Sequence, residues 1–278
     1  MLFDCHTHIT PTAALGVPAV YPPEVLLREM DEWEIDKAVV LPLESPEAFY
    51  VPLPTWYVLE ECKKHADRLV PFCTLDPRLE RGNLEKEFRQ VIQAYLEAGC
   101  AGFGEYKPGT PVDDPRSKIV YAACGEFGVA CLMHFDNAHN MDELGLPKFG
   151  AILREFPEAV FIAHGPGWWR EISADVRWDD GYPTRPLVPG GRVGELLDRH
   201  SHLYGDLSAG SGFNALNRDR EYAREFCRKH WRQLLFGTDL LAPKQEAPII
   251  QLLTELDLTA GQYDAITHGN LERLLARA

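Results

Sequence analysis

The sequence predicts an α/β fold, a single (β/α)8 TIM barrel domain that covers residues 1–278 and carries a long insertion after its sixth strand. Three observations favour this fold. Short apolar runs alternate along the chain with segments whose apolar residues recur every three or four positions. The runs are apolar on both faces, as is typical of parallel strands that are covered from both sides. The length of 278 residues suits one such barrel.

The apolar runs are the predicted strands, and the segments between and after them are the predicted helices. In chain order the strands are Leu2–Cys5, Lys37–Leu43, Leu69–Leu75, Cys100–Glu105, Val129–Phe135, Val160–His164, Leu203–Leu207 and Leu234–Phe236. The helices are Pro23–Trp33, Thr55–His65, Leu84–Ala98, Ser117–Phe127, Pro147–Phe156, Val193–His200, Glu221–Trp231, Pro248–Leu256 and Tyr263–Ala276. Local signals support these boundaries, because Asn83 is a typical helix cap and Gly99 and Gly128 stand where helices should end.

Two connections are longer than an ordinary turn between a strand and a helix. The predicted insertion, Gly165–Gly191, contains Trp168, Trp169 and Trp178, whose rings we expect to pack on other residues because they are costly to leave in water. The second long connection, Glu44–Thr55, is rich in proline and aromatic residues. Such segments are often lids or binding loops, and they could also be contacts between the subunits of a homo-oligomer.

Composition excludes several classes of partner. The net charge of −14 argues against nucleic acid and anionic membrane surfaces, which clustered lysine and arginine would bind, but it leaves a small anionic substrate possible. The seven cysteines are scattered, as is typical of reduced thiols. No apolar run approaches the roughly 20 residues that span a bilayer. We therefore expect a soluble, cytoplasmic protein.

Side chains that can ligate a metal follow the apolar runs. His6 and His8 end the first run two residues apart, and residues at that spacing in a strand point to the same face. Four more such residues end later runs: Glu105, His134, His164 and Asp239. In a barrel these strand ends meet at one mouth, where the chemistry lies. A mixed set of histidines and carboxylates suits zinc, with manganese or iron as alternatives.

The other histidines do not share this placement. His200 and His202 also form a His-x-His pair, but they precede the seventh predicted strand and so belong at the opposite rim of the barrel. Three more histidines fall within predicted helices: His65, His230 and His268. We expect all five to be surface or packing residues.

The chain resembles the amidohydrolase superfamily, in particular the amidohydrolase-related branch that contains aminocarboxymuconate-semialdehyde-type decarboxylases and lactone hydrolases. The resemblance covers nearly the whole chain. Asp4-Cys-His-Thr-His8 is similar to the opening strand of that family, and His134 and His164 match its histidines on strands five and six. The motifs Phe236-Gly-Thr-Asp239 and Gly269-Asn270-Leu-Glu-Arg-Leu-Leu resemble its strand-eight aspartate and its closing helix.

One position departs from the decarboxylases of this branch, which use one metal without a carboxylate from strand four. Glu105 occupies that place here, as in binuclear members such as the TatD-type nucleases, where a strand-four glutamate bridges two metals. Lys107, two residues later, could instead be a carbamylated bridge, or it could simply be paired with Glu105. The number of metals stays open at this stage.

The resemblance implies a hydrolase with a metal-activated water. His6, His8 and Asp239 would hold the divalent metal, most readily zinc, while His134, His164 and Glu105 would complete its coordination or hold a second ion. Asp239 would act as the catalytic base. Asp4 would orient a ligand from outside the coordination shell.

The substrate would be a small molecule. Three residues near strand ends or in the insertion could bind it: Lys107, Trp168 and Arg170. The alternative within the same family is a metal-dependent non-oxidative decarboxylase, in which His164 handles a proton. A metal-free binding barrel is a third hypothesis. A serine hydrolase is disfavoured because Ser208-Ala-Gly-Ser-Gly212 does not match the Gly-x-Ser-x-Gly motif.

Overall fold

The computed structural model describes residues 1–11, 20–48, 52–79 and 82–276. Its strands confirm the eight predicted positions. A three-stranded parallel sheet contains β1 (Phe3–Thr7), β2 (Lys37–Val40) and β3 (Leu69–Pro71). A five-stranded parallel sheet contains β4 (Phe103–Tyr106), β5 (Ala130–His134), β6 (Val160–His164), β7 (Leu203–Asp206) and β8 (Leu234–Leu235). Within each sheet, the order of the strands therefore follows their order in the chain.

Backbone contacts join the two sheets at both edges. At the first junction Cys73 N donates to Gly102 O at 2.9 Å and Gly104 N donates to Cys73 O at 2.8 Å. At the second junction Cys5 N donates to Phe236 O at 2.9 Å and Asp239 N donates to His6 O at 2.8 Å. These bonds hold the C-terminal ends of the strands next to one another in chain order, as the predicted barrel requires.

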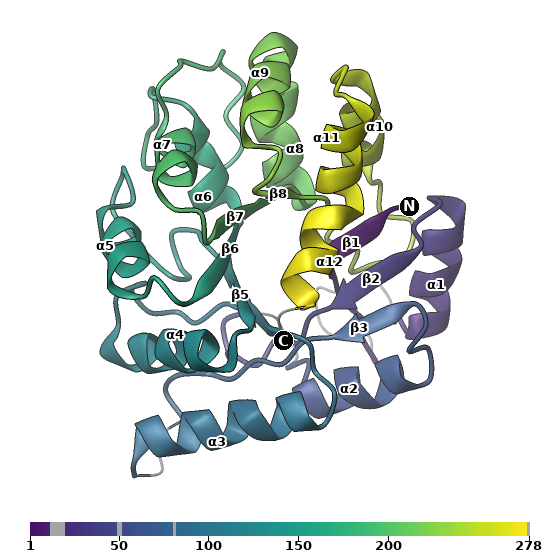
Figure 1. Ribbon diagram of the computed structural model, residues 1–278, viewed down its shortest axis with the longest axis vertical. Coiled ribbons are helices and arrows are strands. Elements are labelled where there is room, and N and C mark those ends of the chain that lie inside the picture. The colour runs from purple at the N-terminus through teal and green to yellow at the C-terminus, as the bar shows by residue number, and fades with distance from the viewer. Residues whose placement is uncertain (12–19, 49–51, 80–81, 277–278) are drawn as a thin grey trace.

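The helices surround the strands, as Figure 1 shows for α1 to α5. Their bounds are α1 (Pro23–Glu32), α2 (Thr55–Lys63), α3 (Leu84–Glu97), α4 (Pro115–Phe127), α5 (Pro147–Glu155), α6 (Pro166–Trp169), η1 (Arg170–Ile172), α7 (Arg192–Arg199), α8 (Ala209–Asn217), α9 (Arg220–His230), α10 (Pro248–Glu255), α11 (Ala260–Asp264), η2 (Ala265–Gly269) and α12 (Asn270–Leu275). The predicted caps are confirmed: the Asn83 side chain accepts from Lys86 N, and Gly128 ends α4 with a φ of 70°. Helix α8 was not predicted, because Ser208–Gly212 has the composition of a loop.

The core has two layers that follow the alternation of side chains along the strands. On β5 and β6, Ala130, Leu132, Val160 and Ile162 pack in an inner cluster, which Leu271 and Leu274 of α12 also join. Their neighbours in the sequence pack outward against the helices. His134 and His164 continue the inner faces at the C-terminal ends of β5 and β6, since they follow at a spacing of two residues. The same alternation that builds the core thus aims both histidines at the mouth.

The connection between β6 and α7 begins with α6 and η1 and then runs without regular structure to Gly191. Trp168 and Trp169 are buried, which confirms that these rings pack on other residues, whereas Trp178 is half exposed. That this segment is an insertion stays a prediction. Residues 49–51 of the other long connection lie outside the described part of the chain.

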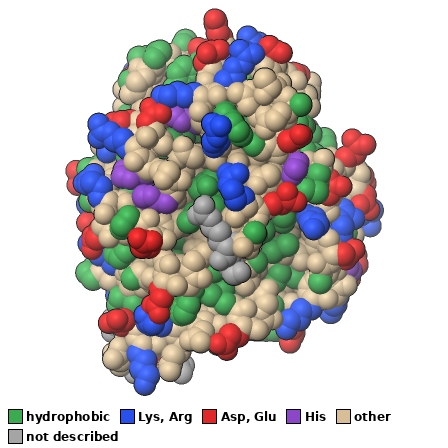
Figure 2. Space-filling model, viewed as in Figure 1, with side chains coloured by type: hydrophobic (Ala, Val, Ile, Leu, Met, Phe, Trp, Pro, Cys, Tyr) green, Lys and Arg blue, Asp and Glu red, His purple; other side chains and the backbone are tan. Residues whose placement is uncertain are grey.

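Charged side chains of both signs lie on the face that Figure 2 draws. In the view of Figure 2, coloured basic and acidic side chains are interspersed, without a continuous basic patch on that face. None of the helices in the described ranges is long and apolar enough to cross a membrane.

Candidate metal centre

The predicted ligands from β1, β4 and the end of β8 meet at one place. His6 Nε2 and His8 Nε2 lie 3.2 Å apart. Asp239 Oδ1 lies 3.5 Å from the first nitrogen and 3.4 Å from the second. Glu105 Oε2 lies 3.9 Å from His6 Nε2 and 3.6 Å from His8 Nε2. Two imidazoles and two carboxylates therefore converge, as the strand-end pattern predicts.

The other nitrogen of each imidazole shows which form the rings take. His8 Nδ1 lies 2.9 Å from Leu41 O, and His6 Nδ1 lies 2.7 Å from Asp206 Oδ2. A carbonyl and a carboxylate can only accept, so both Nδ1 atoms carry a proton and donate it. In neutral rings the two Nε2 atoms then face each other as lone pairs. Such an arrangement calls for a cation between them.

Glu105 connects this pair to the rest of the cluster. Its Oε1 accepts from His134 Nδ1 at 2.7 Å and lies 3.9 Å from Lys107 Nζ. Burial favours the neutral acid, but the charges of Lys107 and His134 outweigh it and hold the pKa of the Glu105 carboxyl well below its usual range. Burial likewise opposes ionisation of Asp239, and His6 and His8 lower the pKa of its carboxyl. Both acids are therefore available as anionic ligands.

His164 lies on the other side of His6, with ring centroids 4.3 Å apart. Its Nδ1 lies 3.1 Å from Asp206 Oδ2 and 3.0 Å from Ser208 Oγ. In the described part of the chain, four groups of side chains each bring potential ligand atoms within 4.8 Å of one another: His6, His8 and Glu105; His6, His164 and Asp239; Glu105, His134 and His164; and His134, Asp136 and His139. The donor set and the facing lone pairs fit one divalent metal or two.

Three acids support the centre from outside. Asp206, at the end of β7, binds both His6 and His164, and these rings lower the pKa of its carboxyl despite its burial. Asp136 Oδ2 lies 3.0 Å from His134 Nε2. Asp4, which the sequence suggested as an orienting residue, accepts from the backbone of His6 and Thr238, and burial raises its pKa to about 7.

The sequence reasoning missed Asp206 and Asp136, although both carried a signal. Asp206 ends the apolar run of β7 just as the predicted ligands end their own runs, and Asp136 follows His134 at a spacing of two. Asp206 thus carries the same sequence signal, an acid at the end of an apolar run, as the predicted carboxylate ligands.

The three residues predicted to bind substrate lie in different surroundings. Lys107 lines a cavity of about 140 Å³ beside the centre. Trp168 is fully buried and packs edge-on against Phe149, so its burial does not support contact with a substrate. Arg170 is almost buried, donates to Asn137 and to the Trp178 carbonyl, and lies 5.0 Å from the Trp178 ring. Trp168 is buried because α6 turns its aromatic face into the core.

The 140 Å³ cavity is small and has a polar and an apolar wall. The polar residues that line it are His8, Thr10, Glu105, Lys107 and Asp239. The apolar residues that line it are Leu43, Ala48, Leu53 and Leu241. A small molecule in this cavity would lie directly against the converging ligands.

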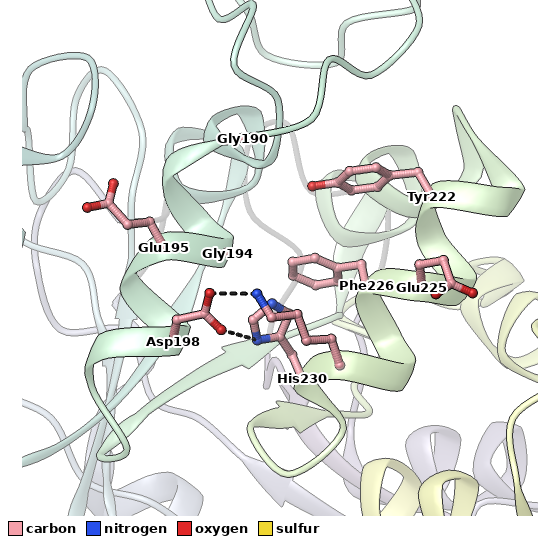
Figure 3. Close-up of a pocket in the computed structure, with 10 residues that line it drawn as sticks. Gly190, Gly194, Glu195, Asp198, Tyr222, Glu225, Phe226 and His230 are labelled. Carbon is pink, nitrogen blue, oxygen red and sulfur yellow. Dashed lines mark hydrogen bonds and ion pairs between the residues drawn. The ribbon is translucent and has the colours of Figure 1, made fainter.

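A more voluminous groove of about 690 Å³ lies between α7 and α9 (Figure 3). Its acids face partners of their own: Asp198 accepts from Lys229 at 2.6 Å and lies 4.0 Å from His230 Nδ1. Burial lowers the pKa of His230 to about 4. The groove contains none of the converging ligands, so we place the candidate active site in the smaller cavity. The buried position of His230 in this groove agrees with the packing role expected for it.

The fold and the centre define a class: a parallel α/β protein with a histidine and carboxylate cluster at the ends of its strands that suits a divalent metal. The model of the amidohydrolase family matches residues 3–277, and the chain belongs to this family. No curated protein matches the sequence.

Solved structures share the fold over the full length. An uncharacterized TIM-barrel protein from Bordetella bronchiseptica is 18% identical, with 99% of each chain covered and a TM-score of 0.70. An amidohydrolase from Burkholderia multivorans with bound zinc is 14% identical, with 100% of each chain covered and a TM-score of 0.65. A probable 2-pyrone-4,6-dicarboxylic acid hydrolase from Acinetobacter baumannii is 13% identical (99% of each chain, 0.64).

Decarboxylases have the same fold. The 2,6-dihydroxybenzoate decarboxylase from Rhizobium is 13% identical, with 99% of this chain and 98% of that chain covered and a TM-score of 0.59. At these identities the likeness establishes the fold alone. The structures that resemble this chain thus include both hydrolases and decarboxylases.

Proposed function

We propose that this protein is a zinc-dependent hydrolase that uses an activated water to cleave an ester, lactone or amide bond of a small molecule. The observation that carries the proposal is the pair of Nε2 atoms of His6 and His8, 3.2 Å apart, which face the Asp239 and Glu105 carboxylates. This mixture of nitrogen and oxygen donors matches catalytic zinc sites, and manganese or iron are the alternatives.

In this proposal each ligand has a defined place. His6, His8 and Asp239 hold the first ion, while Glu105, His134 and His164 complete its coordination or hold a second. A divalent cation held there supplies Lewis acidity, which lowers the pKa of a coordinated water and polarises a carbonyl oxygen. Glu105, rather than Lys107, is the proposed ligand from the end of β4, because its Oε2 faces both Nε2 atoms, whereas the lysine lies 3.9 Å from its other oxygen, Oε1.

Asp239 is the proposed general base. Its side chain is 18% exposed, while those of His6 and Glu105 are at most 2% exposed, so it is the acid of the centre best able to reach a substrate. Its lowered pKa keeps the carboxylate ionised at neutral pH, which is the form that can accept a proton from water and pass it to the leaving group. Its φ of 59° is uncommon outside glycine, and such conformations concentrate at functional sites.

His164 is the second proposed catalytic residue. Its Nδ1 faces Asp206 and Ser208, and so its Nε2 is the atom left to contact a ligand or to hold a proton. In the hydrolase it contributes to the metal site. In a decarboxylase the same nitrogen would deliver the proton that replaces the lost carboxylate.

The cavity sets the proposed substrate. About 140 Å³ accommodates a small molecule with an apolar part against Leu43, Leu53 and Leu241. Lys107 supplies a cation for a carboxylate or a polarised carbonyl of that substrate. The probable pyrone dicarboxylic acid hydrolase and the zinc-bound amidohydrolase among the similar structures support a hydrolase acting on such a molecule. All seven cysteines are free and buried, which supports a place in a reducing compartment such as the cytoplasm.

Metal content and product analysis test the proposal. Protein purified without chelators is analysed for metals, and we expect at least one zinc per chain. The purified protein is then incubated with 2-pyrone-4,6-dicarboxylate, with the neutral δ-valerolactone and with 2,6-dihydroxybenzoate, and products are identified by mass spectrometry. We expect addition of water to a lactone. Release of carbon dioxide without addition of water would favour the decarboxylase, and a chain that retains less than about 0.2 metal would favour a metal-free barrel.

A further inference from the structure

Asp206 occupies an unusual position among the buried acids of this protein. It ends β7, is fully buried, and its two oxygens contact residues from three different strands or connections. Oδ2 lies 2.7 Å from His6 Nδ1 and 3.1 Å from His164 Nδ1. The other oxygen accepts from Ser208 N at 2.8 Å, and Ser208 Oγ donates to Oδ2 at 2.9 Å. One carboxylate therefore serves two imidazoles that come from β1 and β6.

Local backbone geometry keeps this carboxylate in place. Asp206 and Ser208 form a short turn in which the serine backbone and hydroxyl both bind the carboxylate. Gly237 allows the close approach from the β8 side, because a Cβ at that position would lie 2.8 Å from Asp206 Oδ1. A rigid, buried acceptor is therefore built between the two rings before any ligand arrives.

An acceptor in this position decides where each ring carries its proton. A carboxylate cannot donate, so His6 and His164 each place a proton on Nδ1 and keep the lone pair of Nε2. For His6 that lone pair points at His8 Nε2, 3.2 Å away, and for His164 the ligand atoms of His6 and Asp239 lie within 4.8 Å. The third ring, His8, is set by the Leu41 carbonyl instead, which no side-chain substitution removes.

We infer that Asp206 is a positioning residue that fixes the tautomers and orientations of His6 and His164 together, so that one carboxylate prepares two metal ligands on different strands. The inference rests on the metal centre of the proposed function but not on hydrolysis. Carboxylates that hold one ligating histidine are common in metal sites, and their loss costs about 10- to 100-fold in metal affinity. Because Asp206 holds two, its loss should reach the upper end of that range.

The variant Asp206→Asn tests this role with little change in shape. If the amide nitrogen takes the place of Oδ2, it donates toward both rings and drives their protons to Nε2. If the amide oxygen takes that place, the amide nitrogen faces the backbone N–H of Ser208, so this orientation is disfavoured. We expect the dissociation constant for zinc, measured by competition with a chromophoric chelator, to rise about 100-fold. Asp142→Asn, which removes another buried acid that caps α5 through Phe149 N, is the matched control and should leave zinc affinity unchanged.

A second measurement includes a test on the wild type that does not depend on how the variant folds. Long-range ¹H–¹⁵N spectra of the zinc-free wild type report the tautomer of each histidine, and we expect Nδ1–H for His6, His8 and His164. In Asp206→Asn, His8 should be unchanged while at least one of the other two moves to Nε2–H. An Nε2–H tautomer of His6 or His164 in the wild type, or zinc affinity within twofold of the wild type in Asp206→Asn, would overturn the inference.

The outcomes also separate this inference from the proposed function. A wild type that binds zinc but hydrolyses none of the lactone probes contradicts the hydrolase and leaves the role of Asp206 intact. A wild type that hydrolyses a lactone, with Asp206→Asn binding zinc equally well, contradicts the role of Asp206 and leaves the hydrolase intact.

Discussion

Lys107 gives the sharpest test of how the cavity recognises a substrate. Its Nζ lies 3.9 Å from Glu105 Oε1, and its side chain is 18% exposed. At an effective dielectric constant of about 20, opposite charges at this distance attract by about 4 kcal/mol, which solvent at the partly exposed lysine reduces further. The variant Lys107→Met removes this cation and keeps most of the apolar stem. It therefore changes the charge of the site more than its shape.

Two effects of opposite sign should follow. Zinc affinity should rise, because a positive charge next to a divalent cation is lost and the Glu105 carboxylate is freed for the metal. Turnover of an anionic lactone should fall, since a hydrogen bond to a charged group contributes about 1.5–3 kcal/mol. This free energy corresponds to a loss of about 10- to 100-fold in kcat/KM. A neutral lactone of similar size should lose much less.

The assay compares kcat/KM for 2-pyrone-4,6-dicarboxylate and for δ-valerolactone, with zinc affinity measured in parallel. Lys107→Arg retains the charge and should keep most of the preference for the anion. Lys118→Met removes a surface lysine that pairs with Glu155 and should change neither quantity. Equal losses for both lactones would refute charge recognition by Lys107. Loss of bound metal from Lys107→Met, with bicarbonate-dependent recovery in the wild type, would instead identify a carbamylated lysine ligand.

Three further predictions concern the centre, the mouth and the outer groove. Replacing both His6 and His8 by alanine should abolish metal retention and turnover while circular dichroism stays native, and full activity in that double variant would contradict the mechanism. Tyr182 is half exposed, and the pKa of its hydroxyl is raised by burial first and by the negative charge of Asp239 second. Tyr182→Phe should therefore raise KM several-fold without changing metal content, whereas unchanged kinetics would remove Tyr182 from the site. Burial lowers the pKa of His230 from 6.5 to about 4, so the unfolded chain binds the proton more readily, and the free energy of unfolding should fall by up to about 3 kcal/mol as the pH drops from 7 to 4. In His230→Leu, the free energy of unfolding measured with urea should depend less on pH between 7 and 4. The same pH dependence as in the wild type would refute the low pKa assigned to His230.

The strands, the helices and most of the centre followed from local patterns. Apolar runs predicted all eight strands, because burial on both faces leaves a signature in a few consecutive residues. Side chains alternate along a strand, and so the position of His134 and His164 after Leu132 and Ile162 already aimed them at the inner face. Parallel strands bring their C-terminal ends to one mouth, which is why the sequence alone could group ligands that lie far apart in the chain.

Other features depended on contacts between distant segments. Asp206 acquires its importance because β7 lies next to β6 and the mouth brings it to His6 of β1, a relation that no window of the sequence contains. Trp168 turns into the core because α6 packs against Phe149, although an exposed loop with the same composition could have held a substrate. Helix propensity and alternation are local properties, but the partner that a side chain meets is decided by the register of neighbouring strands and by how the helices pack on them.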